Sequence, residues 1–367
     1  MVNKTPSCID LDFWRGKKVL ITGHSGFKGG WLTIWLEQLG CKVTGISLRP
    51  ITTPALFEIA TISSLCDSHF IDIRDLKSLI QLIENTKPEI VFHLAAQPLV
   101  RQSYVEPIET FSTNTIGSSN ILEAVRVTNS VKVVVMVTTD KVYEINEKST
   151  PYKEGDSLGG FDPYSASKAA SELIIDCYRN SFLKSRGVAV ASARAGNVIG
   201  GGDWSEDRLI PDAIRAWSAK ENLILRYPKS IRPWQHVLDP LYGYIILAQL
   251  LAVKPDLAGS FNFGPVLGEP YSVERVIEFA QLFWNDAQFQ VEKNSVNWRE
   301  TAKLQLDTKK AYEVLGIRSV WNTEKSVKQT ILWYQKQALG ADAITLCKND
   351  IKDYQAYLIK NNEEQNA

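Results

Sequence analysis

Tyr164 and Lys168, a tyrosine followed four residues later by a lysine, form the pair whose spacing most directly indicates chemistry. On a helix these positions share a face, so the Lys168 ammonium can lie beside the Tyr164 hydroxyl and favour its phenolate form. A free tyrosine titrates near pH ~10, so a tyrosine that acts as a base near neutral pH needs this help. The pair predicts acid–base chemistry beside a nicotinamide, although a motif this short could also be a chance pair on an exposed helix.

A glycine-rich loop far upstream favours the catalytic interpretation. Its glycines follow the pattern Gly-x-x-Gly-x-x-Gly and stand between a β-rich run, 18–21, and an apolar stretch, 31–36, that we expect to be helical. Such a loop lets the backbone approach a pyrophosphate at the positive end of the helix dipole, whereas a glycine turn without a ligand is the alternative. Lys28 could add a phosphate contact. The cofactor-binding residues predicted here are Gly23, Ser25, Gly26, Phe27, Lys28 and Gly29.

The residues expected to hold the adenosine end of a dinucleotide depart from the common pattern. An acidic residue normally ends the second strand and binds the ribose, but this chain has Ser47, Leu48 and Arg49 there. Arg49 could bind a 2′-phosphate and so favour NADP, or it could be a solvated surface arginine. Asp72 and Ile73, after the third expected strand, could hold the adenine edge. NAD is the cofactor that we predict, with NADP left open because of Arg49.

Mostly small side chains end the fourth expected strand. This edge borders the cofactor crevice in doubly wound folds, so we predict contacts with the cofactor here, with ordinary packing as the alternative. The residues concerned are Leu94, Ala95, Ala96 and Gln97. Asn114, inside the helix-like stretch 111–126, is predicted to brace the catalytic lysine, or it could be a surface asparagine.

The elements that must position these residues alternate in type along the chain. The β-rich runs lie at 18–21, 42–47, 70–71, 90–94, 131–137 and 188–193, with helical stretches between nearly all of them. This βαβα alternation predicts an α/β fold, a Rossmann-type doubly wound parallel sheet with helices on both faces. The continuous apolar run from Val133 to Val137 agrees, since strands of parallel sheets are covered on both sides.

Two packed units suit a chain of 367 residues. Beyond residue 197, glycine-rich loops and shorter elements predict a smaller, interleaved α/β substrate domain. The helix expected at 239–251 would pack back onto the first unit. The predicted bounds are 14–197 and 234–262 for the dinucleotide-binding domain, 198–233 and 263–345 for the substrate domain, and 346–367 for a C-terminal tail.

Composition argues against several other classes of protein. Lys and Arg together number 41, as do Asp and Glu, so net charge gives no attraction to nucleic acid or anionic membranes. The 5 cysteines lack CxxC spacing and the 4 histidines lack ligand-like spacing, so we expect neither a disulfide framework nor a metal site. With no apolar stretch long enough to span a bilayer and no signal peptide, we expect a cytoplasmic protein.

Taken together, these features resemble the extended short-chain dehydrogenase/reductase family, in its nucleotide-sugar branch, over nearly the whole chain. Within that branch, the runs 23–29, 194–204 and 232–237 are similar to the 4,6-dehydratases that act on CDP-glucose. These enzymes carry Asp-Lys, as at Asp140-Lys141 here, where most sugar-nucleotide 4,6-dehydratases carry Asp-Glu. A structural role for Lys141, paired with a nearby carboxylate, is the alternative.

The resemblance implies a reaction in which a C4 ketone forms, water is lost and the cofactor ends as it began. Tyr164 would take the proton of the C4 hydroxyl as a hydride leaves C4 for the nicotinamide. Asp140 would protonate the departing C6 hydroxyl, and Lys141 would remove the C5 hydrogen. Thr139 and Lys168 complete the predicted catalytic set. Hydride return to C6 would give CDP-4-dehydro-6-deoxy-D-glucose, which implies a role in deoxysugar and lipopolysaccharide O-antigen biosynthesis.

These roles require Asp140 to stay protonated and Lys141 to lose its proton. Burial raises the pKa of a carboxyl group and lowers that of an amine, and the charge of Lys168 would lower the pKa of Lys141 further. A close ion pair between Asp140 and Lys141 would oppose both shifts. We therefore predict that the two side chains diverge around the sugar, and Lys141 could instead only orient a water molecule.

Polar residues in the second half of the chain are candidates for binding the sugar nucleotide. Guanidinium forks match phosphate oxygens, although each arginine could equally form a surface salt bridge. The predicted substrate contacts are Gln97, Asn197, Arg208, Arg232 and His236. Two other activities stay open, a nucleotide-sugar 4-epimerase and a 4,6-dehydratase for another nucleotide hexose; a catalytically silent dinucleotide-binding regulator is a third interpretation.

The family also suggests a homodimer, or a dimer of dimers. The contact would be a four-helix arrangement of the helices that carry Asn114 and Tyr164. The alternative is that their apolar residues only face the sheet. Those residues are Ile116, Ile121, Leu122, Val125, Leu173, Ile174 and Ile175.

Overall fold

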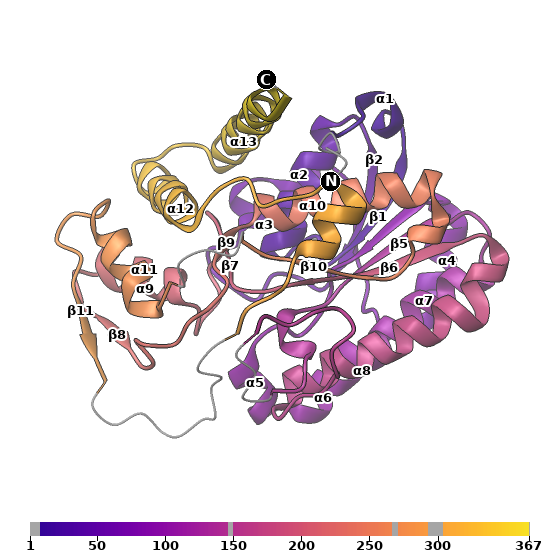
Figure 1. Cartoon of the computed structure of the whole chain (residues 1–367), viewed down its shortest axis with the longest axis horizontal. Helices are drawn as coiled ribbons and strands as arrows, with labels where there is room; N and C mark the ends of the chain where they lie inside the picture. Colours follow the sequence, from indigo (N-terminus) through magenta and orange to yellow (C-terminus); the bar gives the residue numbers. More distant parts are fainter. Residues whose placement is uncertain (1–7, 146–149, 266–270, 293–303, 367) are drawn as a thin grey trace.

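A computed structural model describes residues 8–145, 150–265, 271–292 and 304–366 of the chain, without the side chains of 361–366. Its centre is a 7-stranded sheet in the order β10-β6-β5-β4-β1-β2-β3, with all neighbouring strands parallel (Figure 1). These strands are β1 (Lys18–Thr22), β2 (Lys42–Ser47), β3 (Asp67–Phe70), β4 (Ile90–His93), β5 (Val133–Val137), β6 (Ala189–Ala195) and β10 (Ser260–Phe263). The predicted doubly wound α/β sheet is confirmed.

Helices cover both faces of this sheet (Figure 1). One face carries α4 (Leu76–Thr86), α7 (Gly117–Val127) and α8 (Pro163–Tyr178), and the other carries α2 (Phe27–Gln38), α10 (Leu238–Val253) and α13 (Ala343–Asn366). Alternate residues of a strand pack against the helices on opposite faces of the sheet. Val133 and Val135 belong to the core formed with α2 and α10, whereas Val134 belongs to the core formed with α4 and α7. Burial on both sides explains why β5 is apolar at every position.

The strand order reverses at β1, because β2 and β4 lie on either side of it. Segments that leave the carboxyl ends of β1, β4 and β5 therefore meet at one edge of the sheet. They begin with Gly23, Leu94 and Thr138. Such a switch point is where open α/β sheets bind their ligands, so the fold brings the predicted site segments to the expected place.

A smaller unit, built largely by the chain after β6, lies beside this sheet (Figure 1). It contains the parallel pairs β7 (Val198–Ile199) with β9 (Gln235–His236) and β8 (Leu223–Leu225) with β11 (Phe289–Val291), and the helices α9 (Leu209–Ser218), α11 (Val273–Gln281) and α12 (Thr323–Ala338). The helix expected at 239–251 is α10, which packs against β5 and β6. The numbered domain bounds stay a prediction.

The remaining helices are short. They are α1 (Leu11–Trp14), α3 (Leu56–Ile59), α5 (Val100–Val105) and α6 (Pro107–Phe111). Among the helices that the structure describes, none combines the length and the apolar character needed to cross a membrane.

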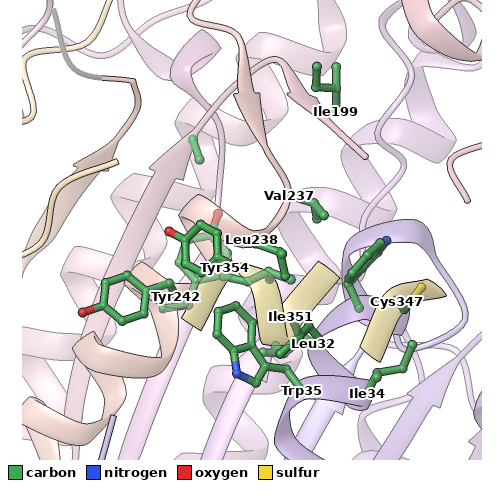
Figure 2. Packing of buried hydrophobic residues seen from close by; sticks show 14 of the residues in the cluster. Leu32, Ile34, Trp35, Ile199, Val237, Leu238, Tyr242, Cys347, Ile351 and Tyr354 are labelled. Atoms are coloured by element: carbon green, nitrogen blue, oxygen red, sulfur yellow. The ribbon is translucent and has the colours of Figure 1, made fainter. Parts of the chain in front are cut away.

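Residues 346–366, most of the segment predicted as a C-terminal tail, lie in α13. Cys347, Ile351 and Tyr354 are 0% exposed, and Figure 2 shows them packed with side chains of α2 and α10. Their spacing places all three on one helix face, which is the pattern of an amphipathic helix against a core. The first half of this segment is therefore part of the main core, and the polar character of the last residues is what suggested a tail.

Asp239, near the start of α10, is a buried carboxylate that joins three segments. Its Oδ1 accepts hydrogen bonds from the backbone N–H of Val320 at 2.7 Å and from the hydroxyl of Tyr354 on α13 at 2.8 Å. Burial raises the pKa of this carboxyl group to about 6. Folding therefore favours its protonated form.

We expect the Asp239→Asn variant to lose part of the pH dependence of stability. The pKa of Asp239 in the folded protein lies above the ordinary aspartate value of ~3.9. Its contribution to the free energy of unfolding is therefore fully present below pH ~3.9 and is lost as the pH rises through the folded pKa. The free energy of unfolding of the variant should exceed that of the wild type by roughly 2–3 kcal/mol near pH ~7.5, and the two should differ little near pH ~4. Urea unfolding at the two pH values measures this difference. Asp12→Asn, whose side chain is 90% exposed, is the control. Parallel pH profiles for wild type and Asp239→Asn would contradict the assignment.

Candidate active site at the carboxyl edge of the sheet

The glycine loop between β1 and α2 forms a cradle that side chains would fill. A Cβ on Gly23, whose φ is +81°, would lie 2.8 Å from the backbone nitrogen of Ala95. A Cβ on Gly29 would lie 2.0 Å from the carbonyl oxygen of Gly23. Gly26 is the N-cap of α2, so the positive end of this helix faces the loop. The cradle fits the pyrophosphate of a dinucleotide.

Two serines fasten this loop to the end of β2. The Ser47 hydroxyl donates to Ser25 Oγ at 2.7 Å, and the Ser25 hydroxyl donates to the carbonyl oxygen of Leu48 at 2.8 Å. Phe27, the first residue of α2, points the other way, since its ring lies 3.2 Å from the place that a Cβ on Gly200 would take. The loop is thus held between β2 and the segment that follows β7.

The predicted adenosine contacts have protein partners of their own. The guanidinium of Arg49 lies 4.4 Å from the centre of the Phe70 ring, a cation–π contact at the end of β3. Asp72 accepts a bidentate pair of hydrogen bonds from Arg74, at 3.0 Å from Nε and 2.6 Å from Nη2. These bonds from Arg74 lower the pKa of the Asp72 carboxyl group. Ile73 is buried at 4% exposure, and its carbonyl oxygen accepts a hydrogen bond from Asn120 Nδ2 at 3.1 Å.

Asn114 supports the segment after β4 and the catalytic helix together. It lies in a π-helical turn, Ser112–Ile116, between α6 and α7. Its side chain exchanges two hydrogen bonds with the backbone of Gln97, at 2.8 and 3.1 Å, and donates to Ser167 Oγ at 2.9 Å. We predicted that Asn114 braces Lys168; it contacts the neighbouring residue Ser167 instead.

The segment from Leu94 to Gln97 is fixed by hydrogen bonds to the protein. The hydroxyl oxygen of Thr22 accepts from the backbone N–H groups of Leu94 and Ala95, both at 3.1 Å. Ala95 and Ala96 are both partly exposed. The side chain of Gln97, predicted to touch cofactor and substrate, donates to Thr110 Oγ1 at 2.8 Å and accepts from the Leu99 N–H at 2.6 Å.

Thr139, Asp140 and Tyr164 form the centre of the site. The Thr139 hydroxyl donates to Asp140 Oδ1 at 3.0 Å and also hydrogen-bonds with the phenol of Tyr164. Asp140 is 1% exposed, and its Oδ2 has no hydrogen-bond partner in the described part of the protein. A Cβ on Gly196 would lie 1.9 Å from this oxygen, so only glycine leaves room for the carboxyl group.

Burial shifts the pKa of each group in this part of the site in the direction that favours its neutral form. The pKa of Asp140 is raised by burial, with the charge of Lys141 opposing the change. Burial also raises the pKa of Tyr164 to about 12 and lowers that of Lys168 to about 8. The Lys168 ammonium donates to the carbonyl oxygen of Val137 at 3.2 Å. Its position beside the Tyr164 hydroxyl stays a prediction.

Asp140 and Lys141 diverge. Both residues are described, and no ion pair within 4.0 Å joins them. Lys141 is partly exposed, whereas Asp140 is buried. The protonated state that an acid needs is therefore compatible with a lysine as its neighbour.

Positive charge gathers around this centre. Lys28 of the glycine loop donates to the hydroxyl of Tyr244 at 3.4 Å. Burial, followed by the charges of Arg208 and Lys168, lowers the pKa of Lys28 to about 7. Arg208 is held by Asp203, with Nη1 2.8 Å from Oδ2. Cations that lower each other's proton affinity in a shared space suit an anionic ligand such as a diphosphate.

Arg232 and Asn197 lie close to the same centre. Arg232 is 6% exposed, and its charge lowers the pKa of Asp140, which places the guanidinium within electrostatic reach of that carboxyl group. Asn197 follows β6 with a left-handed φ of +48°, and its carbonyl oxygen accepts from the Gln235 N–H at 3.3 Å. Their placement is compatible with the predicted substrate contacts.

His236, also predicted to touch substrate, occupies a different environment. It is 0% exposed, and its ring lies between Trp31 and Trp321, with centroids 6.0 and 4.8 Å away. Burial lowers the pKa of this imidazole to about 3. The position suits a core residue rather than a direct substrate contact, because a sequence motif does not distinguish a binding residue from one that packs behind it.

Sequence reasoning missed Glu172, Arg194 and Tyr244. The carboxylate of Glu172 lies 2.8 Å from Nη2 of Arg194, and these side chains are 2% and 3% exposed. Glu172 stands four residues after Lys168, so the spacing that revealed the Tyr164–Lys168 pair could have revealed it too. Tyr244 gave no signal, since it lies in an apolar helix far along the chain.

Comparisons with known proteins identify the family of this chain. Residues 19–262 match the model of the NAD dependent epimerase/dehydratase family. A CDP-glucose 4,6-dehydratase from Salmonella typhimurium is 44% identical, over 94% of this chain and 98% of its own length. A UDP-glucose 4-epimerase from Mycoplasma pneumoniae is 25% identical, over 87% of this chain and 96% of its own length.

Solved structures show the same fold. A UDP-glucose 4-epimerase from Thermotoga maritima with UDP-glucose has a TM-score of 0.76 at 21% identity, covering 88% of this chain and 99% of its own. A dTDP-glucose 4,6-dehydratase from Bacillus anthracis in complex with NAD has a TM-score of 0.72 at 20% identity, covering 90% and 100%. The resemblance to extended short-chain dehydrogenases and reductases is confirmed. On the matched range and the 44% identity, the chain belongs to the NAD dependent epimerase/dehydratase family.

Proposed function

We propose that this chain is a hydro-lyase that converts CDP-D-glucose to CDP-4-dehydro-6-deoxy-D-glucose and water, with NAD as a recycled cofactor. The observation that carries the proposal is the buried Asp140 carboxyl, linked through Thr139 to Tyr164 and with one oxygen unpartnered in the described residues. An epimerase needs the C4 chemistry of Tyr164 but no acid for a departing C6 hydroxyl. The similarity to the Salmonella dehydratase supports the same choice.

The glycine cradle would hold the pyrophosphate of NAD, with Ser25 and Ser47 fixing the loop and Lys28 beside it. When bound, NAD supplies the acceptor for the C4 hydride and the donor for C6. The NAD found in the Bacillus anthracis relative supports NAD over NADP. Arg49, stacked on Phe70, has a structural partner and does not require a 2′-phosphate.

Tyr164 Oη would take the proton of the sugar O4. Because burial raises the pKa of this phenol to about 12, the step needs a nearby cation to stabilise the phenolate. The charge of Arg208 lowers the pKa of this phenol. Lys168, one helical turn later on α8, would supply further positive charge, since its pKa of about 8 leaves it mainly protonated at neutral pH. The Thr139 hydroxyl bonds with Tyr164 and Asp140 and would keep both groups directed at the sugar.

Asp140 would deliver its proton to the departing O6. Burial raises the pKa of this carboxyl group and so favours its protonated form, and its unpartnered Oδ2 is the atom available to donate. Lys141 would take the C5 proton from the other side and return it after C6 is reduced. The anionic diphosphate would lie against Arg208 and Arg232, with Asn197 at the sugar.

Incubation of the purified protein with CDP-glucose, followed by mass spectrometry, tests the proposal. The product should be lighter by one water, whereas epimerisation leaves the mass unchanged. Asp140→Asn should slow water loss by about 10²–10⁴-fold, because a positioned acid contributes that much, while C4 oxidation continues. Asp12→Asn is the control with an exposed aspartate. Equal rates of water loss in Asp140→Asn and wild type would remove Asp140 from the acid role.

The role of Lys141 is tested by exchange at C5 in deuterium oxide. We expect Lys141→Ala to incorporate deuterium at C5 of the product roughly 10²-fold more slowly than the wild type, since a general base of this kind contributes at least that factor. Mass spectrometry and NMR of the sugar measure the label. Lys77→Ala, a lysine on α4, serves as the control. Uptake at the wild-type rate would leave Lys141 only an orienting role.

We further propose that the protein forms a homodimer through the face of α6, α7 and α8. Of the apolar residues considered from sequence, Ile121, Leu122, Val125 and Ile175 are buried against the sheet, but Ile116 and Leu173 are 53% and 63% exposed. Ile108 on α6 is 80% exposed. Apolar side chains gathered on neighbouring helices favour a second copy of the same chain as partner.

Introducing charge on this face should separate the subunits. Leu173→Glu combined with Ile108→Glu should convert a dimer to a monomer, because two carboxylates per subunit would be buried unpaired in the contact. Light scattering coupled to size-exclusion chromatography measures the mass. Leu339→Glu is the matched control, since Leu339 is 88% exposed after α12. A double variant with the mass of the wild-type dimer would exclude this face as the interface.

A further inference from the structure

Glu172 lies at the junction of the catalytic helix and the ends of two strands. Its Oε1 accepts from the Thr138 hydroxyl, just after β5, at 2.5 Å, and its Oε2 accepts from Ser192 Oγ of β6 at 2.8 Å. Arg194 of β6 donates to Oε2 at 2.8 Å. Both carboxylate oxygens are therefore bonded, and the side chain is only 2% exposed.

The same contacts fix the group to which Lys168 is bonded. The Lys168 ammonium donates to the carbonyl oxygen of Val137, and Val137 shares a peptide unit with Thr138. Two hydrogen bonds hold Thr138. Its backbone N–H donates to the carbonyl oxygen of Ala193 at 3.0 Å, and its hydroxyl donates to Oε1 of Glu172. Glu172 thus helps to hold the acceptor for the catalytic lysine.

Glu172 also supplies charge. Burial, the largest single effect, would raise the pKa of its carboxyl group. The hydrogen bond and charge of Arg194 together with the hydrogen bonds from Thr138 and Ser192 outweigh it, so the pKa is lowered and the carboxylate form is favoured. Burial lowers the pKa of Lys168 to about 8, and the charge of Glu172 opposes that fall.

Two other titratable groups face Lys168, but neither supplies negative charge. Lys28 of α2 is a cation that repels it. His93 of β4 is held neutral, since burial lowers its pKa to about 3 and its ring bonds with Thr22 and Ser118. The charge of Lys168 therefore depends on Glu172.

We propose that Glu172 is a positioning residue for the acid–base step at Tyr164, acting through Lys168: it keeps the lysine cationic and holds the Val137–Thr138 peptide that orients it. Only the test of this inference by activity rests on the proposed function. The carboxylate touches neither the sugar nor the phenol. Its effect reaches O4 of the substrate through the charge of Lys168, which stabilises the Tyr164 phenolate.

Two variants separate this role from a structural one. Glu172→Gln removes the charge but leaves Arg194 buried without its counter-ion, which by itself destabilises a protein. Glu172→Gln combined with Arg194→Gln removes both charges, so its core stays neutral. Glu123→Gln, which breaks another glutamate–arginine pair at 2.6 Å on α7, is the matched control.

The first readout is the titration of Lys168 itself, followed by NMR of ¹³Cε-lysine-labelled protein and assigned by the loss of its signal in Lys168→Met. In the double variant the pKa of Lys168 should fall by about one unit or more relative to wild type, because the opposing charge is gone. The control should titrate as the wild type. A wild-type titration in a folded double variant would overturn the proposal.

The second readout is the pH dependence of C4 oxidation of CDP-glucose. In both Glu172 variants the alkaline limb should move to lower pH by about one unit, with KM changed less than about twofold, because the charge acts on the chemical step. A loss of rate that is uniform over pH would show a purely structural role and also overturn the proposal. If the wild type turns over no hexose nucleotide, the proposed function fails, whereas the NMR titration still decides the role of Glu172.

Discussion

Glycines at the carboxyl edge of the sheet let backbone and side chains approach one another more closely than any Cβ would allow. At Gly23 and Gly29 the clash would be with backbone, which cannot rotate away. At Gly196 it would be with the carboxyl group of Asp140. The first two contacts shape the loop proposed to hold a dinucleotide, and the third leaves room for the Asp140 carboxyl group against the segment that follows β6. The loop proposed for the dinucleotide and the pocket of Asp140 therefore both require glycine at these positions.

This close packing also explains the charge state of the site. Desolvation penalises whichever form of a group is charged, so it raises the pKa of Asp140 and lowers those of Lys28 and Lys168. The fully buried Glu172 escapes this trend only because Arg194, Thr138 and Ser192 bond to it. The site therefore combines one carboxylate, Glu172, whose ionised form is favoured, with two lysines of lowered pKa and one carboxyl group, Asp140, of raised pKa. An anionic nucleotide entering this space would raise the pKa of Lys28 again, because a nearby negative charge favours the protonated amine.

Much of this arrangement could be predicted from residue types and spacing. The expected strands agree closely with β1, β2, β4, β5 and β6, because continuous apolar runs between turns leave few alternatives for a parallel sheet. The third expected strand, 70–71, shares only Phe70 with β3, whose residues are mostly polar. The spacing of Tyr164 and Lys168 correctly placed both on α8. Contacts between distant segments could not be predicted: His236 stands within a recognisable motif yet packs between two tryptophans, and the Lys168 ammonium bonds to Val137. Local pattern identifies which residues matter but does not determine the direction of each side chain.

The divergence of Asp140 and Lys141 has a local cause that a motif does not reveal. Thr139 is extended, with φ −150° and ψ 161°, and Asp140 begins the 3₁₀ turn Asp140–Val142. With ~3 residues per turn, successive side chains in such a turn point about 120° apart. Asp140 is therefore directed into the buried site while Lys141 stays partly exposed, and two opposite charges that are adjacent in sequence form no ion pair within 4.0 Å of each other. A regular strand would also separate them, but onto opposite faces of the sheet, and only one could then reach the sugar. The tight turn would let both proposed catalytic groups approach one substrate while burial of Asp140 favours its protonated form.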